Sequence, residues 1–203
     1  MVLSPEQRLT LLLIARRAVE AAVCGREPPV LATNDGQLDE ARCGVFVTIK
    51  TNGQLRGCIG RFVGDHPLPQ LVGMMAVSAA TQDPRFTSNR LRSHELCDCH
   101  IELSVLSPLE RIANPLDFKI GKHGIYLRSG NRTGCFLPRV GPDAGWTAEQ
   151  MLTQCCVRKS GLAGDAWRNG DVEVFRFTAE VFEEPHFHVV SPVAVGNFVV
   201  QTN

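Results

Sequence analysis

The chain has 203 residues, 44% of them hydrophobic and 21% charged, which is enough for one large domain with an ordinary core. Its 21 Lys and Arg residues balance 21 Asp and Glu residues, so no overall field draws it to a phosphate backbone or an anionic membrane. No segment approaches the roughly 20 apolar residues that span a bilayer, so we expect no membrane partner. Aromatic residues, at 6%, are not interleaved with basic runs, so the sequence gives no direct evidence for nucleic-acid binding.

The eight cysteines are interpreted as the reduced thiols of a cytoplasmic protein. The N-terminal segment lacks the basic-then-apolar order of a secretory signal, and Arg16 and Arg17 interrupt its apolar run. The motifs CDCH at 97–100 and HFH at 186–188 lack the paired Cys-x-x-Cys spacing of structural zinc sites, so we expect no dedicated metal site. No Gly-rich phosphate loop joins a strand to a helix, and we expect no cofactor.

The first predicted element is a helix that begins at Pro5 and ends at Cys24. Ser4 can cap it, Gln7 completes a capping box, and Gly25 provides a left-handed stop. One stripe of the helix is apolar with a basic edge, and we expect this stripe to pack on a sheet. Its members are Leu9, Leu12, Leu13, Arg16 and Val19.

The next predicted element is a β-hairpin formed by the runs GVFVTIK at 44–50 and QLRGCIG at 54–60. The Asn-Gly pair at 52–53 favours a type I′ turn, because both residues tolerate positive φ. A regular ladder that starts from this turn places Cys58 opposite Val47.

Helices and strands continue to alternate along the rest of the chain. The pattern predicts a helix over 66–82, a strand over 98–108, a second hairpin with a longer loop over 124–138, a capped helix over 145–162 and one long strand over 172–182. This order lacks a regular βαβ rhythm and favours an α+β fold, with a mainly antiparallel sheet flanked by helices and a smaller second lobe. We expect residues 1–184 to form the domain and residues 185–203 a C-terminal tail.

The second strand of the hairpin carries a thiol between two glycines. Residues two apart on a strand share a face, so Arg56 and Cys58 are expected to point the same way, and a guanidinium beside a thiol favours the thiolate. Gly57 and Gly60 indicate a bulge or the close approach of another backbone or a ligand. The structural alternative stays open, because a cysteine among core valines is usually a small buried hydrophobe.

Four further polar residues are candidates for a site with this thiol. Glu102 lies on the polar face of its strand, and His123 lies in a loop from which a histidine can reach into a cleft. With Cys58 they would supply a nucleophile, a proton shuttle and an orienting carboxylate. Asp83 and Arg85 follow a predicted helix end, where they either bind a polar substrate or pin a loop by hydrogen bonds.

Six motifs follow one another in a definite order. They are LRGCIG at 55–60, SAATQDPRF at 78–86, IELSVLSP at 101–108, GKHGI at 121–125, FLPRVG at 136–141 and GW at 145–146 before a capped helix. In these motifs the chain resembles the AMMECR family, from about Leu38 to Glu184. The resemblance implies a two-lobed α+β fold with a cleft near LRGCIG. It also implies the role of the A component of an AmmeMemoRadiSam system, beside a Memo-like and a radical-SAM protein, but no particular reaction.

The chain departs from the family pattern at two places. The family tends to have Leu-Pro-Gln-Val-Ala where this chain has LPRVG at 137–141, so Arg139 replaces a glutamine. The family also tends to have Cys-x-Lys-Ala-Gly-Leu where this chain has VRKSGL at 157–162, with the cysteine one position early at Cys156. If those family residues contact a ligand, this chain binds a different ligand or none.

The leading hypothesis is an enzyme, or the substrate-handling component of one, that acts with the Memo-like and radical-SAM partners on a small molecule or a modified macromolecule. In this hypothesis the catalytic residues are Cys58, His123 and Glu102, and the substrate-binding residues are Arg56, Gly57, Gly60, Asp83 and Arg85. Two alternatives stay open: a non-catalytic adaptor with a protein-binding groove, and a small-molecule sensor with a preformed pocket and no turnover.

Overall fold

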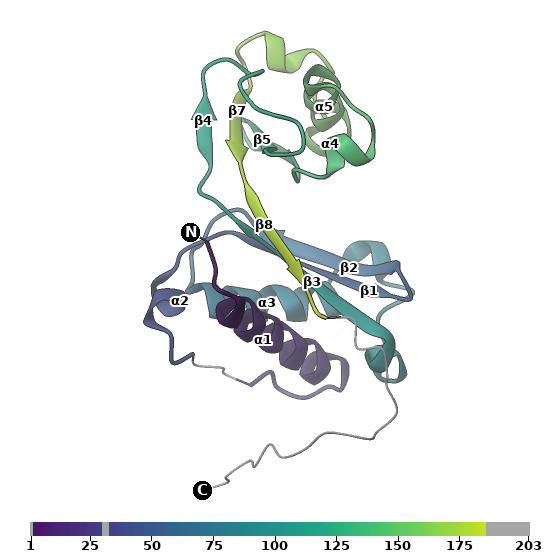
Figure 1. The fold of residues 1–203 in the computed structure, drawn as a ribbon. Helices are drawn as coiled ribbons and strands as arrows, with labels where there is room; N and C mark the ends of the chain where they lie inside the picture. The colour runs from purple at the N-terminus through teal and green to yellow at the C-terminus, as the bar shows by residue number, and fades with distance from the viewer. Residues whose placement is uncertain (1, 30–32, 186–203) are drawn as a thin grey trace, which may run out of the picture.

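The computed structural model describes residues 2–29 and 33–185, which form two lobes, each built on a four-stranded antiparallel sheet (Figure 1). The second lobe is an insertion in the first, because it lies between strands β3 (Cys99–Leu106) and β8 (Ala179–Glu183) of the first sheet. The predicted α+β class, the antiparallel sheets and the second lobe are confirmed. Within the described ranges no helix is long and apolar enough to cross a membrane.

The sheet of the first lobe has the strand order β2-β1-β3-β8, where β1 is Val45–Thr51 and β2 is Gln54–Arg61. Helices α1 (Pro5–Val23) and α3 (Leu68–Thr81) cover one face of this sheet, and the short α2 (Gly36–Glu40) packs beside α3 (Figure 1). The core between helices and sheet includes side chains that are fully buried: Leu11, Val19, Val45, Val47, Ile49, Leu71, Ile101 and Leu103. The opposite face of the sheet is turned toward the second lobe.

Helix α1 has the predicted start, but its buried face matches the predicted stripe only in part, at Leu12 and Val19. The Ser4 side chain accepts a hydrogen bond from the Gln7 amide, and the Gln7 side chain accepts one from the Ser4 amide. Gly25 adopts a φ of 66° after the helix ends. Two members of the predicted stripe, Leu9 and Leu13, are 51% and 48% exposed. The buried face is centred on Leu11, Leu12, Ile14, Ala15, Ala18 and Val19, because the alanines let α1 pack closely on α3 and the sheet.

The first hairpin has the predicted turn, but its register is not the predicted one. Asn52 and Gly53 both have positive φ, at 51° and 76°, as a type I′ turn requires. Lys50 then pairs with Leu55 and Ile49 with Gly57, so Arg56 is an extra residue that forms a β-bulge in β2. Every later pair is shifted by one, so Cys58 lies opposite Thr48 and not opposite the predicted Val47. A one-residue shift moves a side chain to the other face of a sheet.

The sheet of the second lobe has the order β4-β7-β5-β6. Its strands are β4 (Glu110–Ile112), β5 (Gly124–Ser129), β6 (Arg132–Phe136) and β7 (Glu173–Phe177). Helices α4 (Val140–Asp143) and α5 (Ala148–Cys155) follow β6, and α5 continues into a π-helical turn, Cys156–Ser160. Among the described residues, 3-10 turns are formed by Pro84–Phe86, Ser93–Asp98 and Ala166–Arg168.

Two predictions about this half of the chain are wrong. The loop between β5 and β6 is short, since Ser129 pairs with Arg132. The single long strand predicted over 172–182 is two strands, β7 and β8, which belong to different sheets and are separated by Thr178. The backbone passes from the second lobe to the first at Thr178. The Thr178 amide donates a hydrogen bond to the hydroxyl of Ser107, which lies where the chain leaves β3 for the second lobe.

Aromatic rings join the two lobes beside these crossings. Phe62, which follows β2, lies 5.0 Å from the Phe46 ring of the first lobe. It also lies 4.9 Å from Tyr126 and 5.5 Å from Phe177 of the second lobe. Such tilted and edge-on pairs each add stabilisation beyond the apolar area they bury. The lobes are therefore packed against each other through a shared aromatic cluster, which fixes the cleft between them.

Candidate functional site

Cys58 lies on the face of the first sheet that is turned toward the second lobe. The β2 bulge brings it beside Thr48, whose hydroxyl donates a hydrogen bond to the Cys58 sulfur over 3.3 Å. The thiol is half-buried, whereas the core valines of β1 point to the helices on the opposite face. The reading of Cys58 as one more core hydrophobe among those valines therefore does not hold.

Arg56 is directed away from this thiol. Its guanidinium makes two bonds to the Glu95 carboxylate, the shorter of them 2.5 Å, and donates to the carbonyls of Asn89 and Arg90. Hydrogen bonding from Arg56 is the largest cause of the lowered pKa of Glu95. Arg56 thus pins the segment that precedes β3 to the edge of β2, and the predicted pairing of its charge with Cys58 is not seen.

Asp83 and Arg85 instead hold the backbone on both sides of Cys58. The Asp83 carboxylate accepts the Cys58 amide at 2.9 Å, and the Arg85 guanidinium donates to the Cys58 carbonyl at 3.1 Å. Arg85 also bonds Asp83 at 2.7 Å and is the largest cause of the lowered pKa of that carboxyl, which is only 4% exposed. In turn the pKa of Arg85 is raised, mainly by Asp83 and to a lesser extent by the nearby Cys58. Arg85 is therefore the cationic neighbour of the thiol.

The two glycines beside Cys58 are both required by packing. A Cβ at Gly57 would overlap the carbonyl oxygen of Ala79 in α3, and a Cβ at Gly60 would overlap the Phe46 ring on the other face. The expected close approach of another backbone is therefore present at Gly57. The assignment of these glycines to substrate binding stays a prediction.

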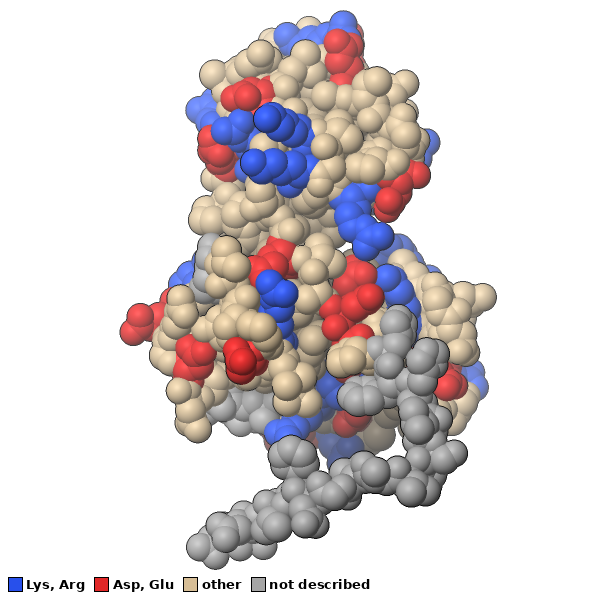
Figure 2. Space-filling model, in the orientation of Figure 1, with Lys and Arg blue, Asp and Glu red and all other residues tan. Residues whose placement is uncertain are grey.

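A cavity of about 220 Å³ lies between the lobes on the same face of the first sheet. The sheet contributes Lys50, Glu102, Ser104 and Val181, and the second lobe contributes Leu137, Pro138, Arg139, Val140 and Asp143. Lys50 and Glu102 form an ion pair at 3.0 Å. Figure 2 shows basic and acidic side chains next to each other in the narrow region where the two lobes meet. The predicted site residue Glu102 and the departure at Arg139 thus meet in one cavity.

The thiol and this cavity are neighbours but not in contact. Cys58, Thr48 and Glu102 occupy one row across three adjacent strands. Strands lie about 4.8 Å apart, so Cys58 and Glu102 are separated by about 10 Å. A hydrogen bond between a Cys58 nucleophile and the Glu102 carboxylate is excluded by this spacing.

Cys135 is a second thiol near Cys58, and no sequence motif predicts this proximity. It lies on β6 and pairs with Tyr126, and it is close enough to Cys58 for their charges to interact across the lobe junction. Burial raises the pKa of Cys135 to about 11, and Lys159 opposes this effect in part. Its place beside the FLPR motif was the available signal, but the facing lobes that bring it to Cys58 lie far apart in sequence.

His123 lies in the second lobe, where its Nδ1 accepts a hydrogen bond from the Lys119 amide at 3.0 Å. Its pKa is lowered, first by burial and then by the charges of Lys122 and Arg176. No hydrogen bond or ion pair between described residues links His123 to Cys58 or Glu102. The predicted catalytic group of three is therefore not assembled in this conformation.

Metal ligands do not cluster in the described ranges, where no group of three or more His, Cys, Asp or Glu residues is placed to hold an ion. Cys97 is exposed in a 3-10 turn and Cys99 is buried at the start of β3, so they do not share a face. The HFH motif at 186–188 and the predicted tail lie outside the described residues.

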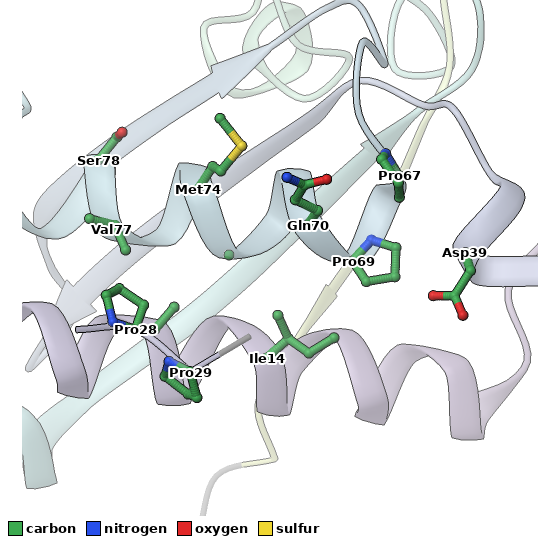
Figure 3. A pocket seen from close by; sticks show the side chains of 12 residues that line it. Ile14, Pro28, Pro29, Asp39, Pro67, Pro69, Gln70, Met74, Val77 and Ser78 are labelled. Atoms are coloured by element: carbon green, nitrogen blue, oxygen red, sulfur yellow. The ribbon is translucent and has the colours of Figure 1, made fainter. Parts of the chain in front are cut away.

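A larger cavity lies elsewhere, between α1 and α3 on the side away from the sheet (Figure 3). It has a volume of about 710 Å³ and a mainly aliphatic wall that includes Ile14, Met74, Val77 and several prolines. Asp39 is the one ionisable side chain among the described residues that line it. This groove therefore offers apolar surface but no thiol, imidazole or cation for chemistry.

These features define a class of protein: a two-lobed α+β fold that presents a half-buried thiol and a charged cavity at the junction of its lobes. Residues 12–182 match the model of the AMMECR1 family, and the chain belongs to this family. The resemblance stated from the motifs is thereby confirmed.

Three relatives illustrate the match. A protein of Methanothermobacter thermautotrophicus is 37% identical over 188 residues, which cover 90% of this chain and 96% of that protein. A protein of Thermococcus onnurineus is 39% identical over 188 residues, with 85% and 88% covered. A crystal structure of an uncharacterised protein from Pyrococcus horikoshii, 35% identical, matches with a TM-score of 0.77 over 86% of this chain and 89% of that chain.

Proposed function

We propose that the protein is an enzyme, or the substrate-handling component of one, that uses the Cys58 thiol at the lobe junction as nucleophile or thiolate ligand. It acts with a Memo-like and a radical-SAM partner on a small molecule or a modified macromolecule. The observation that carries this proposal is the clamp on Cys58: Asp83 and Arg85 fix its backbone from one side while Thr48 orients its sulfur from the other. This clamp holds the thiol in one position at the lobe junction, as a nucleophile or a metal ligand requires.

The roles in this proposal differ from those expected from the sequence. Arg85 takes the place of Arg56 as the cation beside the thiol. Thr48 positions the sulfur, and Glu102 acts in the neighbouring cavity and not as a partner of the thiol. His123 retains a role only if substrate or a partner protein brings it to the cleft.

The test is site-resolved alkylation of the native protein with iodoacetamide at neutral pH. We expect Cys58 to be labelled well ahead of the fully buried Cys155, and Cys58→Ser to retain stability while losing complementation in cells. Cys97→Ser is the matched control, because Cys97 is exposed and takes no part in the hydrogen bonds of the clamp. Labelling of Cys58 as slow as that of Cys155, with full complementation by Cys58→Ser, would refute a role for the thiol.

The partner half of the proposal has a separate test. Co-expression of the chain with Memo-like and radical-SAM proteins from the same genome should yield a complex at near-stoichiometric level. Failure to co-purify with either protein, in the presence and absence of reductant, would count against these partners.

The adaptor function is the second candidate, and exposed leucines favour it. Leu9 and Leu13 lie one turn apart on α1 and are about half exposed. Arg16, next on the same face, is not free to bind a partner, because it is bound to Glu184 and to the carbonyls of Leu96 and Cys99. A Leu9→Ser/Leu13→Ser double variant that abolishes complementation, while Cys58→Ser preserves it, would favour the adaptor.

A further inference from the structure

The wall of the interlobe cavity contains a hydroxyl that has no hydrogen-bond partner among the described residues. Ser104 lies on β3, two residues after Glu102 and on the same face, and it is 2% exposed. It lines the cavity, and its hydroxyl makes no hydrogen bond with any described residue. The Ser104 hydroxyl is therefore free to donate to or accept from a polar group that enters the cavity.

The cavity also contains a cation that has no carboxylate partner. Arg139, at the start of α4, is exposed, and its guanidinium forms no ion pair with any described residue. The other cation, Lys50, is already paired with Glu102, and Asp143 is the second acid in the wall. Arg139 is thus the uncompensated donor of the cavity. A planar guanidinium suits two-point contact with a carboxylate or a phosphate.

The size and position of the cavity restrict what it can hold. Its volume of about 220 Å³ is below the roughly 300–1,000 Å³ of sites that enclose drug-sized ligands, so only a small molecule or one end of a longer molecule fits. Cys58 and Glu102 are two strand spacings apart, so the thiol lies about 10 Å from the end of a ligand that is bound in the cavity.

We infer that the interlobe cavity is an anion-binding subsite, in which Arg139, Ser104 and Lys50 bind the carboxylate or phosphate end of an elongated ligand whose reacting group reaches Cys58. This inference rests on the proposed function in linking the two positions. Arg139 is the specificity-determining residue of the subsite. Glu102 limits its affinity, because its carboxylate occupies Lys50 and repels the ligand.

The experiment titrates the full chain with inorganic phosphate, with acetate and with neutral acetamide, and follows binding by NMR shifts of backbone amides. We expect both anions, but not acetamide, to shift residues around 137–143 and 102–104. Arg139→Gln should weaken the preferred anion about tenfold or more, as expected for loss of a charge-assisted hydrogen bond. Glu102→Gln should tighten it, because Lys50 is released. Whichever anion binds more tightly identifies the ligand as a phosphate or a carboxylate.

Arg90→Gln is the matched control, because it removes the same charge from an exposed arginine outside the cavity. Since the Arg139 side chain has no partner, Arg139→Gln should keep the unfolding midpoint of the wild type. The inference is overturned if neither anion binds the wild type, or if Arg139→Gln binds within twofold of Arg90→Gln.

Repeating the titration with Cys58→Ser separates this inference from the proposed function. Anion binding that depends on Arg139 in a protein whose thiol proves inert would refute the thiol's role and support the subsite. A reactive Cys58 without such binding would refute the subsite alone.

Discussion

Replacement of Asp83 by asparagine is the sharpest test of the clamp that holds Cys58. The carboxylate is 2% exposed in its side chain and accepts the Cys58 amide and three bonds from Arg85. Asparagine turns one acceptor oxygen into a donor, so at least one buried bond is lost. A bond to a buried charged group is worth about 1.5–3 kcal/mol. The Arg85 side chain is 55% exposed, so its share is discounted for solvent screening.

We therefore expect Asp83→Asn to lower the free energy of unfolding by about 2–3 kcal/mol at pH 7, measured by urea denaturation. Arg85→Ala, the control, should cost about 1 kcal/mol or less, because its guanidinium is largely solvated. The folded pKa of Asp83 is lowered, so its stabilisation is fully present above its unfolded pKa and is lost as the pH falls through the folded value.

The difference between wild type and Asp83→Asn should accordingly shrink as the pH falls below about 4. Equal stability of the two proteins at pH 7, or a difference that does not change with pH, would contradict this account of the clamp.

Four other predictions test the packing and the thiols. Gly73→Ala should stabilise the protein by about 0.5–1 kcal/mol in urea denaturation, because the added methyl meets one side-chain carbon at 3.8 Å and favours helix α3. Gly57→Ala should destabilise it by about 3 kcal/mol or more in the same assay, because its methyl would overlap the Ala79 carbonyl. Phe62→Ala should cost about 2 kcal/mol and split the calorimetric transition in two, since this ring joins the lobes. Cys135, with a pKa raised to about 11, should remain unlabelled by iodoacetamide at pH 8.

The hairpin that carries Cys58 shows where sequence-based reasoning succeeds and where it stops. The Asn-Gly pair at 52–53 determines the turn through local backbone preference, and both positive φ angles are present. The bulge at Arg56 has no such local signature. It follows from bonds that Arg56 makes to Glu95 and to the 89–90 carbonyls, which a pattern within the strand does not encode. One inserted residue then reversed the face predicted for Cys58.

The sequence pattern did not predict where the chain passes from one lobe to the other, or which residues meet at their junction. The alternation of residues 172–182 continues through Thr178, so nothing in the pattern marks the passage from one sheet to the other. Cys135, Ser104 and Arg139 come together only because the second lobe folds back over the first sheet. Family resemblance predicted the cleft, but its lining residues required coordinates.

The candidate site is better defined once the residues with a structural role are set aside. Packing or backbone hydrogen bonding accounts for five residues singled out from the motifs: Arg56, Gly57, Gly60, Asp83 and Arg85. The same needs do not account for three others at the lobe junction. The Cys58 sulfur accepts a hydrogen bond from Thr48 but stays half-buried at the lobe junction, the Ser104 hydroxyl makes no bond to a described residue, and the Arg139 guanidinium has no counter-ion among them. Because Ser104 and Arg139 line the cavity and Cys58 lies about 10 Å from Glu102 on the same face of the first sheet, the chemistry is best sought along this face at the lobe junction.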